Sequence, residues 1–284
     1  MIEARGPRWE TAAELLACPI CSDGLFPAGA SLRCAAGHSF DIARQGYVSL
    51  LTGKGSAHRS DTADMVAARN RVFDAGLYAP IVAAVAERCA HSRVIVDAGG
   101  GPGQYLEAGL TAAGDHAVGI GVDLSKFCAR SAARRHPAVL SVVADLWAGL
   151  PLRDGVADTV LSVFAPRNAS ETARVLGSGG RWVVVTPGTG HLAEIVRPMQ
   201  MLSVGQDKTR RLAEDFGDRF GEVVEQRVQS QVRLSESALT DIAAMGPAAF
   251  HRTPEQLAAA AAELASGGPV TATLDVTVTV ARRR

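Results

Sequence analysis

The stretch VIVDAGGGPG, residues 94–103, decides the fold of this chain. Its first three residues are apolar and β-branched, as in a buried strand, and the glycines that follow cannot continue that strand. The pattern predicts a strand that ends at Asp97, a tight turn, and a helix that begins at Gln104. A glycine-rich turn in this place lets a ligand approach the backbone and points helix N–H groups at it.

The spacing within the turn distinguishes two kinds of cofactor site. Asp97 opens the turn, and Gly99, Gly101 and Gly103 recur at alternate positions, with Pro102 between the last two. Nicotinamide sites instead place the first glycine directly after the strand and direct the pyrophosphate at the helix N-terminus. An acidic residue at the strand end suits an ammonium group, such as that of S-adenosylmethionine. The pattern therefore favours S-adenosylmethionine over a nicotinamide cofactor, and over a turn that binds nothing.

Two further aspartates end the next two expected strands. Asp123 closes residues 117–123, at the distance from the turn where an acidic residue accepts hydrogen bonds from ribose hydroxyls. Asp145 closes residues 139–145, where the adenine amino group of such a cofactor is met. The carboxyl ends of parallel strands share one edge of a sheet, so we expect the three aspartates to form one cofactor site.

Short apolar runs alternate with helical runs over most of the chain. The pattern predicts further strands at 157–164 and 181–186, and helices over 61–77, 81–89, 104–113, 126–135 and 257–265. Residues 222–234 and 270–281 are expected to be long strands, and the second alternates polar and apolar residues, as a half-exposed antiparallel strand does. We predict an α/β fold with a Rossmann-like class I methyltransferase sheet, parallel except for an antiparallel C-terminal edge.

Four possible metal ligands lie close together near the N-terminus. Cys18 and Cys21 are separated by two residues, and Cys34 is followed by His38. Three thiolates and one imidazole can occupy the corners of a tetrahedral zinc site, with residues 24–32 forming a hairpin between its two halves. A redox-active cysteine pair would need a thioredoxin-like setting, which is missing. We predict a small N-terminal domain stabilised by one structural zinc.

The composition bounds the class of protein. In 284 residues, 47% are hydrophobic, and 29 basic residues balance 29 acidic ones, so a sizeable core is available while net charge indicates no partner. Apolar runs stay short of the about 20 residues that cross a bilayer. Five cysteines fit a reducing compartment, and Cys89 and Cys128, on expected helices, are interpreted as buried structural residues. We expect a cytoplasmic protein without membrane association.

A polar stretch at residues 51–60 is interpreted as a linker. We therefore divide the chain into a zinc-binding, RNA-recognition domain with its linker, residues 1–58, and a methyltransferase domain, residues 59–284. Residues 33–59 contain four basic residues and one acidic residue, Asp41, so we expect the zinc module to be the face that binds RNA. The basic residues are Arg33, Arg44, Lys54 and Arg59. The C-terminal Arg282, Arg283 and Arg284 could join that face, or form a solvated tail.

With these parts placed, the chain resembles the family of 23S ribosomal RNA guanine-N1 methyltransferases, most closely its tylosin-resistance branch. The resemblance covers essentially the whole chain and extends beyond the cofactor turn, which many methyltransferases share. It rests on the Cys18–His38 set and on HSFDIARQGYVSLL (38–51), DTADMVAARNRVFDAGLYAP (61–80), DAGGGPG (97–103), VFAPRN (163–168) and VVTPGTGHL (184–192).

The resemblance implies methyl transfer to guanine N1 in a hairpin loop of 23S RNA domain II, beside the peptide exit tunnel. It also implies a homodimer whose zinc modules help to form the RNA cleft, with zinc held by the three cysteines and His38. Contacts with S-adenosylmethionine are implied for Tyr78, Gly101, Pro102 and His191. The VFAPRN segment favours the macrolide-resistance branch over the branch that modifies a neighbouring guanine.

The loop after the fourth strand carries the candidate catalytic residues, Phe164, Arg167 and Asn168. Phe164 could stack on a flipped base or be a core aromatic. Arg167 could stabilise an anion at guanine O6, contact phosphate, or be solvated. No residue stands out as the base for the guanine N1 proton.

Two other functions share some of these sequence features. A small-molecule or quinone methyltransferase would cap its active site with helices, whereas this chain carries an arginine-rich zinc module. A zinc-dependent RNA-binding protein with an inactive cofactor domain is disfavoured by the intact turn and by Asp123.

Overall fold

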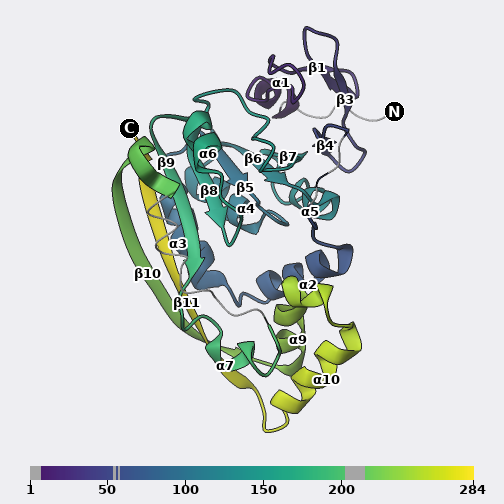
Figure 1. Cartoon of the computed structure of the whole chain (residues 1–284), viewed down its shortest axis with the longest axis vertical. Helices are drawn as coiled ribbons and strands as arrows, with labels where there is room; N and C mark the ends of the chain where they lie inside the picture. Colours follow the sequence, from purple (N-terminus) through teal and green to yellow (C-terminus); the bar gives the residue numbers. More distant parts are fainter. Residues whose placement is uncertain (1–7, 54–55, 57, 202–214) are drawn as a thin grey trace.

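The computed structural model of the protein describes residues 8–53, 56, 58–201 and 215–284 (Figure 1). Eight strands form one sheet in the order β10-β11-β9-β8-β5-β6-β7-β4. Strands β4 to β9 run parallel to one another, and β10 and β11 add an antiparallel edge next to β9. The predicted fold class is therefore confirmed. The strands of this sheet are β4 (Tyr47–Ser49), β5 (Val94–Ala98), β6 (Val118–Asp123), β7 (Val139–Val143), β8 (Ala157–Val163), β9 (Leu176–Pro187), β10 (Phe220–Leu234) and β11 (Val270–Arg283).

The two faces of the sheet are buried by different parts of the chain. Successive side chains of a strand point to opposite faces, so Ile95 and Val96 of β5 belong to different clusters of buried residues. The cluster of Ile95 includes residues of α3 (Ala79–Cys89) and α4 (Gln104–Ala113). The cluster of Val96 includes residues of α6 (Ala169–Val175) and of the N-terminal module. Cys89 and Cys128 are buried, as interpreted from the sequence; Cys128 lies on α5 (Lys126–Ala132).

The N-terminal module consists of α1 (Arg8–Ala13) and a three-stranded antiparallel sheet of β1 (Phe26–Ala28), β2 (Ser31–Arg33) and β3 (Ser39–Asp41). Its first two strands form a hairpin within the segment where the sequence predicts one. The next strand, β4, leaves this small sheet and pairs in parallel with β7 at the edge of the large one. Residues assigned to the zinc module thus complete the sheet of the catalytic domain.

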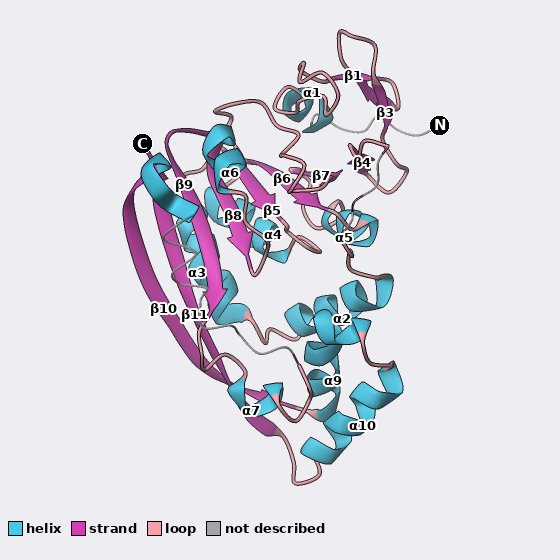
Figure 2. Cartoon of the chain, in the orientation of Figure 1, coloured by secondary structure: helices cyan, strands magenta, loops and turns pink. Residues whose placement is uncertain are grey.

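A group of helices lies beyond the carboxyl ends of the central strands (Figure 2). Its members are α2 (Ala63–Asp74), α9 (Glu236–Ala244), η2 (Pro247–Phe250) and α10 (Pro254–Leu264), while α7 (Ala193–Val196) and η1 (Gly217–Arg219) flank β9 and β10. Thr62 caps the N-terminus of α2 by accepting a hydrogen bond from the Met65 backbone N–H. Arg71 of α2 donates hydrogen bonds to both carboxylate oxygens of Asp241 on α9. Among the described residues, no helix is long and apolar enough to cross a membrane.

The expectation that β11 is half exposed holds only in part. Thr271 is exposed and Thr273 and Thr277 are half-buried, whereas Asp275 and Thr279, on the same polar face, are 1% and 0% exposed. β11 lies between β9 and β10, so its polar side chains need partners within the protein. The Asp275 carboxylate accepts hydrogen bonds from the Arg227 guanidinium on β10 and from the Gly190 backbone N–H.

Candidate functional site

The glycine-rich turn follows β5 directly and ends where α4 begins. Gly99, Gly101 and Gly103 all have positive φ angles, which favour glycine. A Cβ atom on Gly103 would lie 2.9 Å from that of Ala132, and one on Gly99 would lie 2.7 Å from that of Ala165. The turn is therefore fixed by both backbone conformation and close packing, and any larger side chain would displace it.

Asp123, at the end of β6, supports the same turn. Its carboxylate accepts hydrogen bonds from the backbone N–H of Gly101, at 2.9 Å, and of Ser125, at 2.7 Å. Burial raises the pKa of this carboxyl, while the two N–H donors oppose that rise. The carboxylate faces the pocket with acceptor capacity left for a ligand.

A pocket of about 540 Å³ opens at the carboxyl ends of β5, β6, β7 and β8. A cavity of this size is typical of a cofactor site. Gly103 does not line it, because the residue packs against Ala132 instead. The structure brings the other predicted cofactor residues together around the pocket. These are Tyr78, Asp97, Gly99, Gly101, Pro102, Asp123, Asp145 and His191.

The deepest polar group of the pocket is the carboxylate of Asp97. It is 1% exposed, and neither oxygen has a hydrogen-bond partner among the described residues. Burial, together with the nearby Asp123, raises the pKa of Asp97 to about 7. The Tyr105 hydroxyl is also buried without such a partner. An unpartnered buried carboxylate beside a hydroxyl fits a ligand that brings an ammonium group into the pocket.

His191 also lines the pocket. Its Nδ1 accepts a hydrogen bond from the Asp275 backbone N–H at 3.2 Å, so its ring proton is on Nε2. Burial lowers the pKa of His191 to about 4, although the Asp275 carboxylate opposes this shift. The ring is 5.6 Å from that of Phe164 and 6.2 Å from that of Tyr78. His191 is thus a neutral hydrogen-bond donor within an aromatic group, and not a base at neutral pH.

The three candidate catalytic residues lie in different surroundings. Phe164 lines the pocket, is 41% exposed and has a φ of 54°, so it is not a core aromatic. The Arg167 guanidinium is paired with Asp215 at 2.7 Å. Asn168 caps α6 by accepting a hydrogen bond from the Glu171 N–H, and it donates one to the Leu146 carbonyl. Neither Arg167 nor Asn168 lines the pocket.

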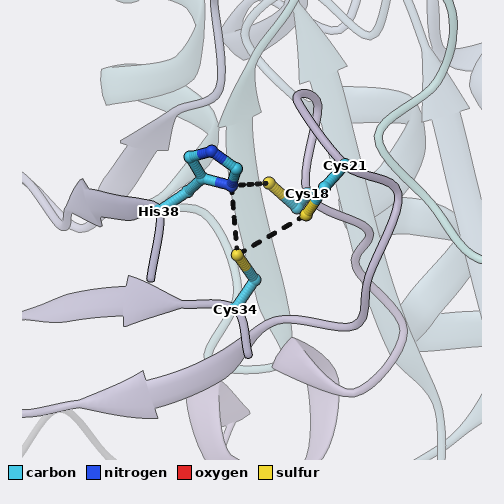
Figure 3. A group of neighbouring side chains, drawn as sticks. All are labelled: Cys18, Cys21, Cys34 and His38. Atoms are coloured by element: carbon cyan, nitrogen blue, oxygen red, sulfur yellow. Dashed lines mark hydrogen bonds between the residues drawn. The ribbon is translucent and has the colours of Figure 1, made fainter. Parts of the chain in front are cut away.

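The four predicted metal ligands converge in the N-terminal module (Figure 3). The Cys21 and Cys34 sulfurs are 3.6 Å apart, and His38 Nδ1 lies 3.6 Å from the Cys18 sulfur and 3.3 Å from that of Cys34. Tetrahedral zinc, with bonds of about 2.0–2.3 Å, separates such ligand atoms by about 3.5–3.8 Å. The donor set and the distances therefore fit zinc. All four corners come from the protein, as in a structural site.

Sequence reasoning missed many residues of the pocket, three of which are Arg69, Tyr105 and Trp147. Arg69 on α2 lines it, with its guanidinium paired with Asp61 at 2.5 Å and donating to the Met245 carbonyl at 2.6 Å. The sequence shows only that Arg69 falls at helical spacing. Its contact with Met245 joins residues 176 positions apart, so no local pattern indicates it.

Comparison with known proteins identifies both parts of the chain. A zinc-ribbon family model described as "RlmA, N-terminal" matches residues 16–54. The 23S rRNA (guanine(748)-N(1))-methyltransferase of Streptomyces fradiae is 45% identical over 273 residues, which cover 94% of this chain and 96% of that protein. This chain belongs to the 23S rRNA (guanine-N1)-methyltransferase family. A Micromonospora griseorubida protein whose name assigns it to the same family is 40% identical, over 92% of this chain and 95% of the relative.

A solved structure agrees with the family's fold. The complex between the Haloferax volcanii Trm112 methyltransferase activator and a methyltransferase has a chain that is 18% identical, with a TM-score of 0.50. The match covers 80% of this chain and 99% of the other. Membership of the guanine-N1 methyltransferase family confirms the predicted enzyme class and its cofactor, S-adenosylmethionine. The zinc-ribbon match and the ligand geometry confirm the predicted zinc site.

Proposed function

We propose that this protein methylates N1 of a guanine in a hairpin loop of 23S ribosomal RNA domain II, beside the peptide exit tunnel. The observation that carries the proposal is the 45% identity, over nearly both full lengths, to a methyltransferase named for guanine 748 of 23S rRNA. The buried, unpartnered Asp97 at the glycine-rich turn supports an intact cofactor site. We propose the same guanine as the target.

The proposal predicts a methyl mark that reverse transcription detects. Methylation at N1 blocks the Watson–Crick edge, so primer extension on 23S RNA from cells that express the protein should stop next to that guanine. RNA from cells that lack the gene is the matched control and should be read through. A stop of equal strength in both samples, or in neither, would contradict the proposal.

S-adenosylmethionine supplies a methyl group on a sulfonium, and transfer requires that the guanine N1 lie in line with it at near-attack distance. We assign the methionine ammonium to Asp97, the ribose hydroxyls to Asp123 and the adenine amino group to Asp145. His191 donates from Nε2 into the pocket and, with Nδ1 occupied, does not accept the guanine N1 proton. Roles in cofactor binding are likewise proposed for Tyr78, Gly99, Gly101 and Pro102, whereas Gly103 shapes the turn by packing against Ala132.

The loop after β8 is proposed to hold the target base. Phe164 presents its ring at the pocket, beside the ring of His191, and its positive φ sets that direction. We propose that it stacks on the flipped guanine. Arg167 and Asn168 fix the shape of the loop through Asp215 and the Leu146 carbonyl.

Asp123→Ala is expected to weaken S-adenosylmethionine binding at least roughly tenfold. The change removes acceptors for ribose hydroxyls, and each charge-assisted hydrogen bond is worth about 1.5–3 kcal/mol. It also frees the Gly101 N–H that Asp123 holds. Calorimetric titration measures the change, and RNA affinity should stay the same. Unchanged cofactor affinity would show that Asp123 does not contact the ribose.

We propose that residues 1–58 form the RNA-recognition domain and residues 59–284 the methyltransferase domain. The side chains of Arg33, Arg44 and Arg59 are exposed, as an RNA-binding face requires, whereas Lys54 lies outside the described residues.

We also propose a cytoplasmic homodimer that confers macrolide resistance. A doubled mass in light scattering, and higher macrolide tolerance in a susceptible host, are the expected results.

Replacement of both Arg33 and Arg44 by Ala should weaken RNA binding and flatten its dependence on salt. Each lost phosphate contact removes about one unit from the slope of log affinity against log salt. Binding of a domain II hairpin transcript, measured at two salt concentrations, tests this. Arg233→Ala, at an exposed position on β10 on the opposite edge of the sheet, is the control. An unaltered slope in the double variant would remove the zinc module from the RNA interface.

A further inference from the structure

An aromatic pair stands at the mouth of the pocket, where the linker meets the loop after β7. Trp147 lies two residues after Asp145, and its side chain is 55% exposed. Its ring centroid is 6.1 Å from that of His58, which belongs to the linker. The other two tryptophans of the chain, Trp9 and Trp182, are 2% and 0% exposed. A tryptophan this exposed leaves a large apolar ring in water unless a partner covers it.

Asp145 lies between the two segments that carry the aromatic pair. Its carboxylate accepts a hydrogen bond from the Trp147 backbone N–H at 3.0 Å, which fixes the loop. Ser56 and His58 of the linker lie close enough to the same carboxylate to lower its pKa. A second cavity, on the zinc-module side, is also lined by Ser56 and Asp145, so the rings stand where the zinc module and the catalytic pocket meet.

The adenine of the cofactor has other apolar neighbours. Leu124 and Leu146 directly follow Asp123 and Asp145 and line the same pocket. The Leu146 side chain reaches within 3.4 Å of the position that a Cβ atom on Gly99 would occupy, so it lies against the cofactor turn. Trp147 follows Leu146 in the chain, also lines the pocket, and is 55% exposed. This arrangement leaves Trp147 free for the second substrate.

The chemistry of the mouth suits a nucleic-acid strand. Next to His58 in the chain, Arg59 places its guanidinium 5.8 Å from the centroid of the Phe250 ring, and both Arg59 and Phe250 line the pocket. Exposed aromatic rings interspersed with cations are the surface on which unpaired bases stack while their phosphates are neutralised. A guanine that flips out of a hairpin loop also leaves its neighbour without a stacking partner.

We propose that Trp147, backed by His58, is a stacking platform for an unpaired RNA base next to the guanine that enters the pocket. The proposal rests on the proposed function, because it takes RNA as the substrate. It adds a subsite that positions the strand and does not touch the reacting atoms. Stacking there replaces part of the stacking that the loop loses when the guanine leaves it.

Tryptophan fluorescence tests the contact directly. Trp147 is the one exposed tryptophan, so titration with a domain II hairpin transcript should quench the emission of the protein. The quenching should vanish in Trp147→Phe while RNA binding persists. Quenching of equal size in Trp147→Phe would place the signal elsewhere and overturn the proposal.

Affinity measurements test how much the Trp147 contact contributes to RNA binding. Trp147→Ala should raise the Kd for the hairpin transcript about 5- to 150-fold, the range for loss of one base–aromatic stack. Trp147→Phe should recover most of this loss. The slope of affinity against salt should stay unchanged, because no phosphate contact is removed. Val224→Ala, which alters an equally exposed apolar residue on β10, is the control and should have no effect.

The outcomes separate this proposal from the proposed function. A Trp147→Ala variant that binds and methylates RNA as well as the wild type would overturn the stacking platform and leave guanine methylation in place. A variant that loses affinity for S-adenosylmethionine instead would assign Trp147 to the adenine site and also overturn the platform. Failure of the wild-type protein to methylate the transcript would contradict the proposed function itself.

Discussion

Replacement of Asp97 by Asn is expected to lower the affinity for S-adenosylmethionine at least about 100-fold. The Asp97 carboxylate is buried without a partner among the described residues, so the methionine ammonium that we propose to bind there would meet it where water cannot compete. Removal of one partner from such a buried charge pair costs about 3–5 kcal/mol. Calorimetry or equilibrium dialysis with the cofactor alone measures the loss, independently of RNA.

The same residue should make cofactor binding depend on pH. The pKa of Asp97 is raised to about 7, and the ammonium requires the ionised form. Binding should therefore be about tenfold weaker at pH 6 than at pH 8 in the wild type, and independent of pH in Asp97→Asn. Asp145→Asn is the control and should keep the pH dependence of the wild type. Hydrogen bonds from Ser56 and Trp147 outweigh the effect of burial and keep the pKa of Asp145 low. A flat wild-type profile would remove Asp97 from the ammonium site.

The pKa of Asp97 also predicts the sign of a stability change. A folded-state pKa above the ordinary value of 3.8 means that the folded protein holds a proton that the unfolded chain releases. Stability of the ligand-free protein should therefore rise as the pH falls through about 7. At pH 8, Asp97→Asn should melt at a higher temperature than the wild type, since the ionised carboxylate destabilises the empty pocket.

Cys34→Ser is expected to abolish stoichiometric zinc binding and to unfold the N-terminal module. Structural zinc contributes about 10–16 kcal/mol of binding free energy to small modules, and a hydroxyl is a poor substitute for a thiolate. Three-residue strands and a six-residue helix leave this module with little core of its own. Elemental analysis of the purified protein and limited proteolysis of the N-terminal region measure the two effects.

The control for this change is Cys89→Ala. Cys89 is buried against Gly109 in the catalytic domain, so its removal should lower stability while the protein keeps one zinc per chain. Full zinc occupancy in Cys34→Ser would contradict the four-ligand assignment. Zinc loss in both variants would indicate general unfolding instead.

The sequence predicts the parts of the site that local pattern determines. Asp97, Asp123 and Asp145 each end a strand, and parallel strands bring their carboxyl ends to one edge, so their convergence follows from order along the chain. Cys18 and His38 are recognisable because zinc restricts both the ligand types and their spacing. These features need no knowledge of long-range packing.

Other parts of the site depend on contacts that no local pattern encodes. Asp275 occupies a polar position of an alternating strand, and its burial follows from β10 and the Gly190 loop, which cover it. Arg69 is one basic residue on an amphipathic helix until Asp61 and Met245 are placed beside it. Trp147 stands in no pattern that the sequence analysis singles out, and only the structure shows that it is exposed beside the pocket.

The pairing of β4 with β7 constrains the order in which the chain folds during its synthesis. The N-terminal module leaves the ribosome first, but the edge on which β4 docks is completed only when β7 emerges, with α2, α3, α4 and α5 in between. Zinc can fold the small module at once, whereas β4 cannot pair with the large sheet until β5, β6 and β7 have been made. The pairing of β4 with β7 closes a long loop of the chain, which is a slow step. Until this pairing forms, β4 is available for wrong pairings.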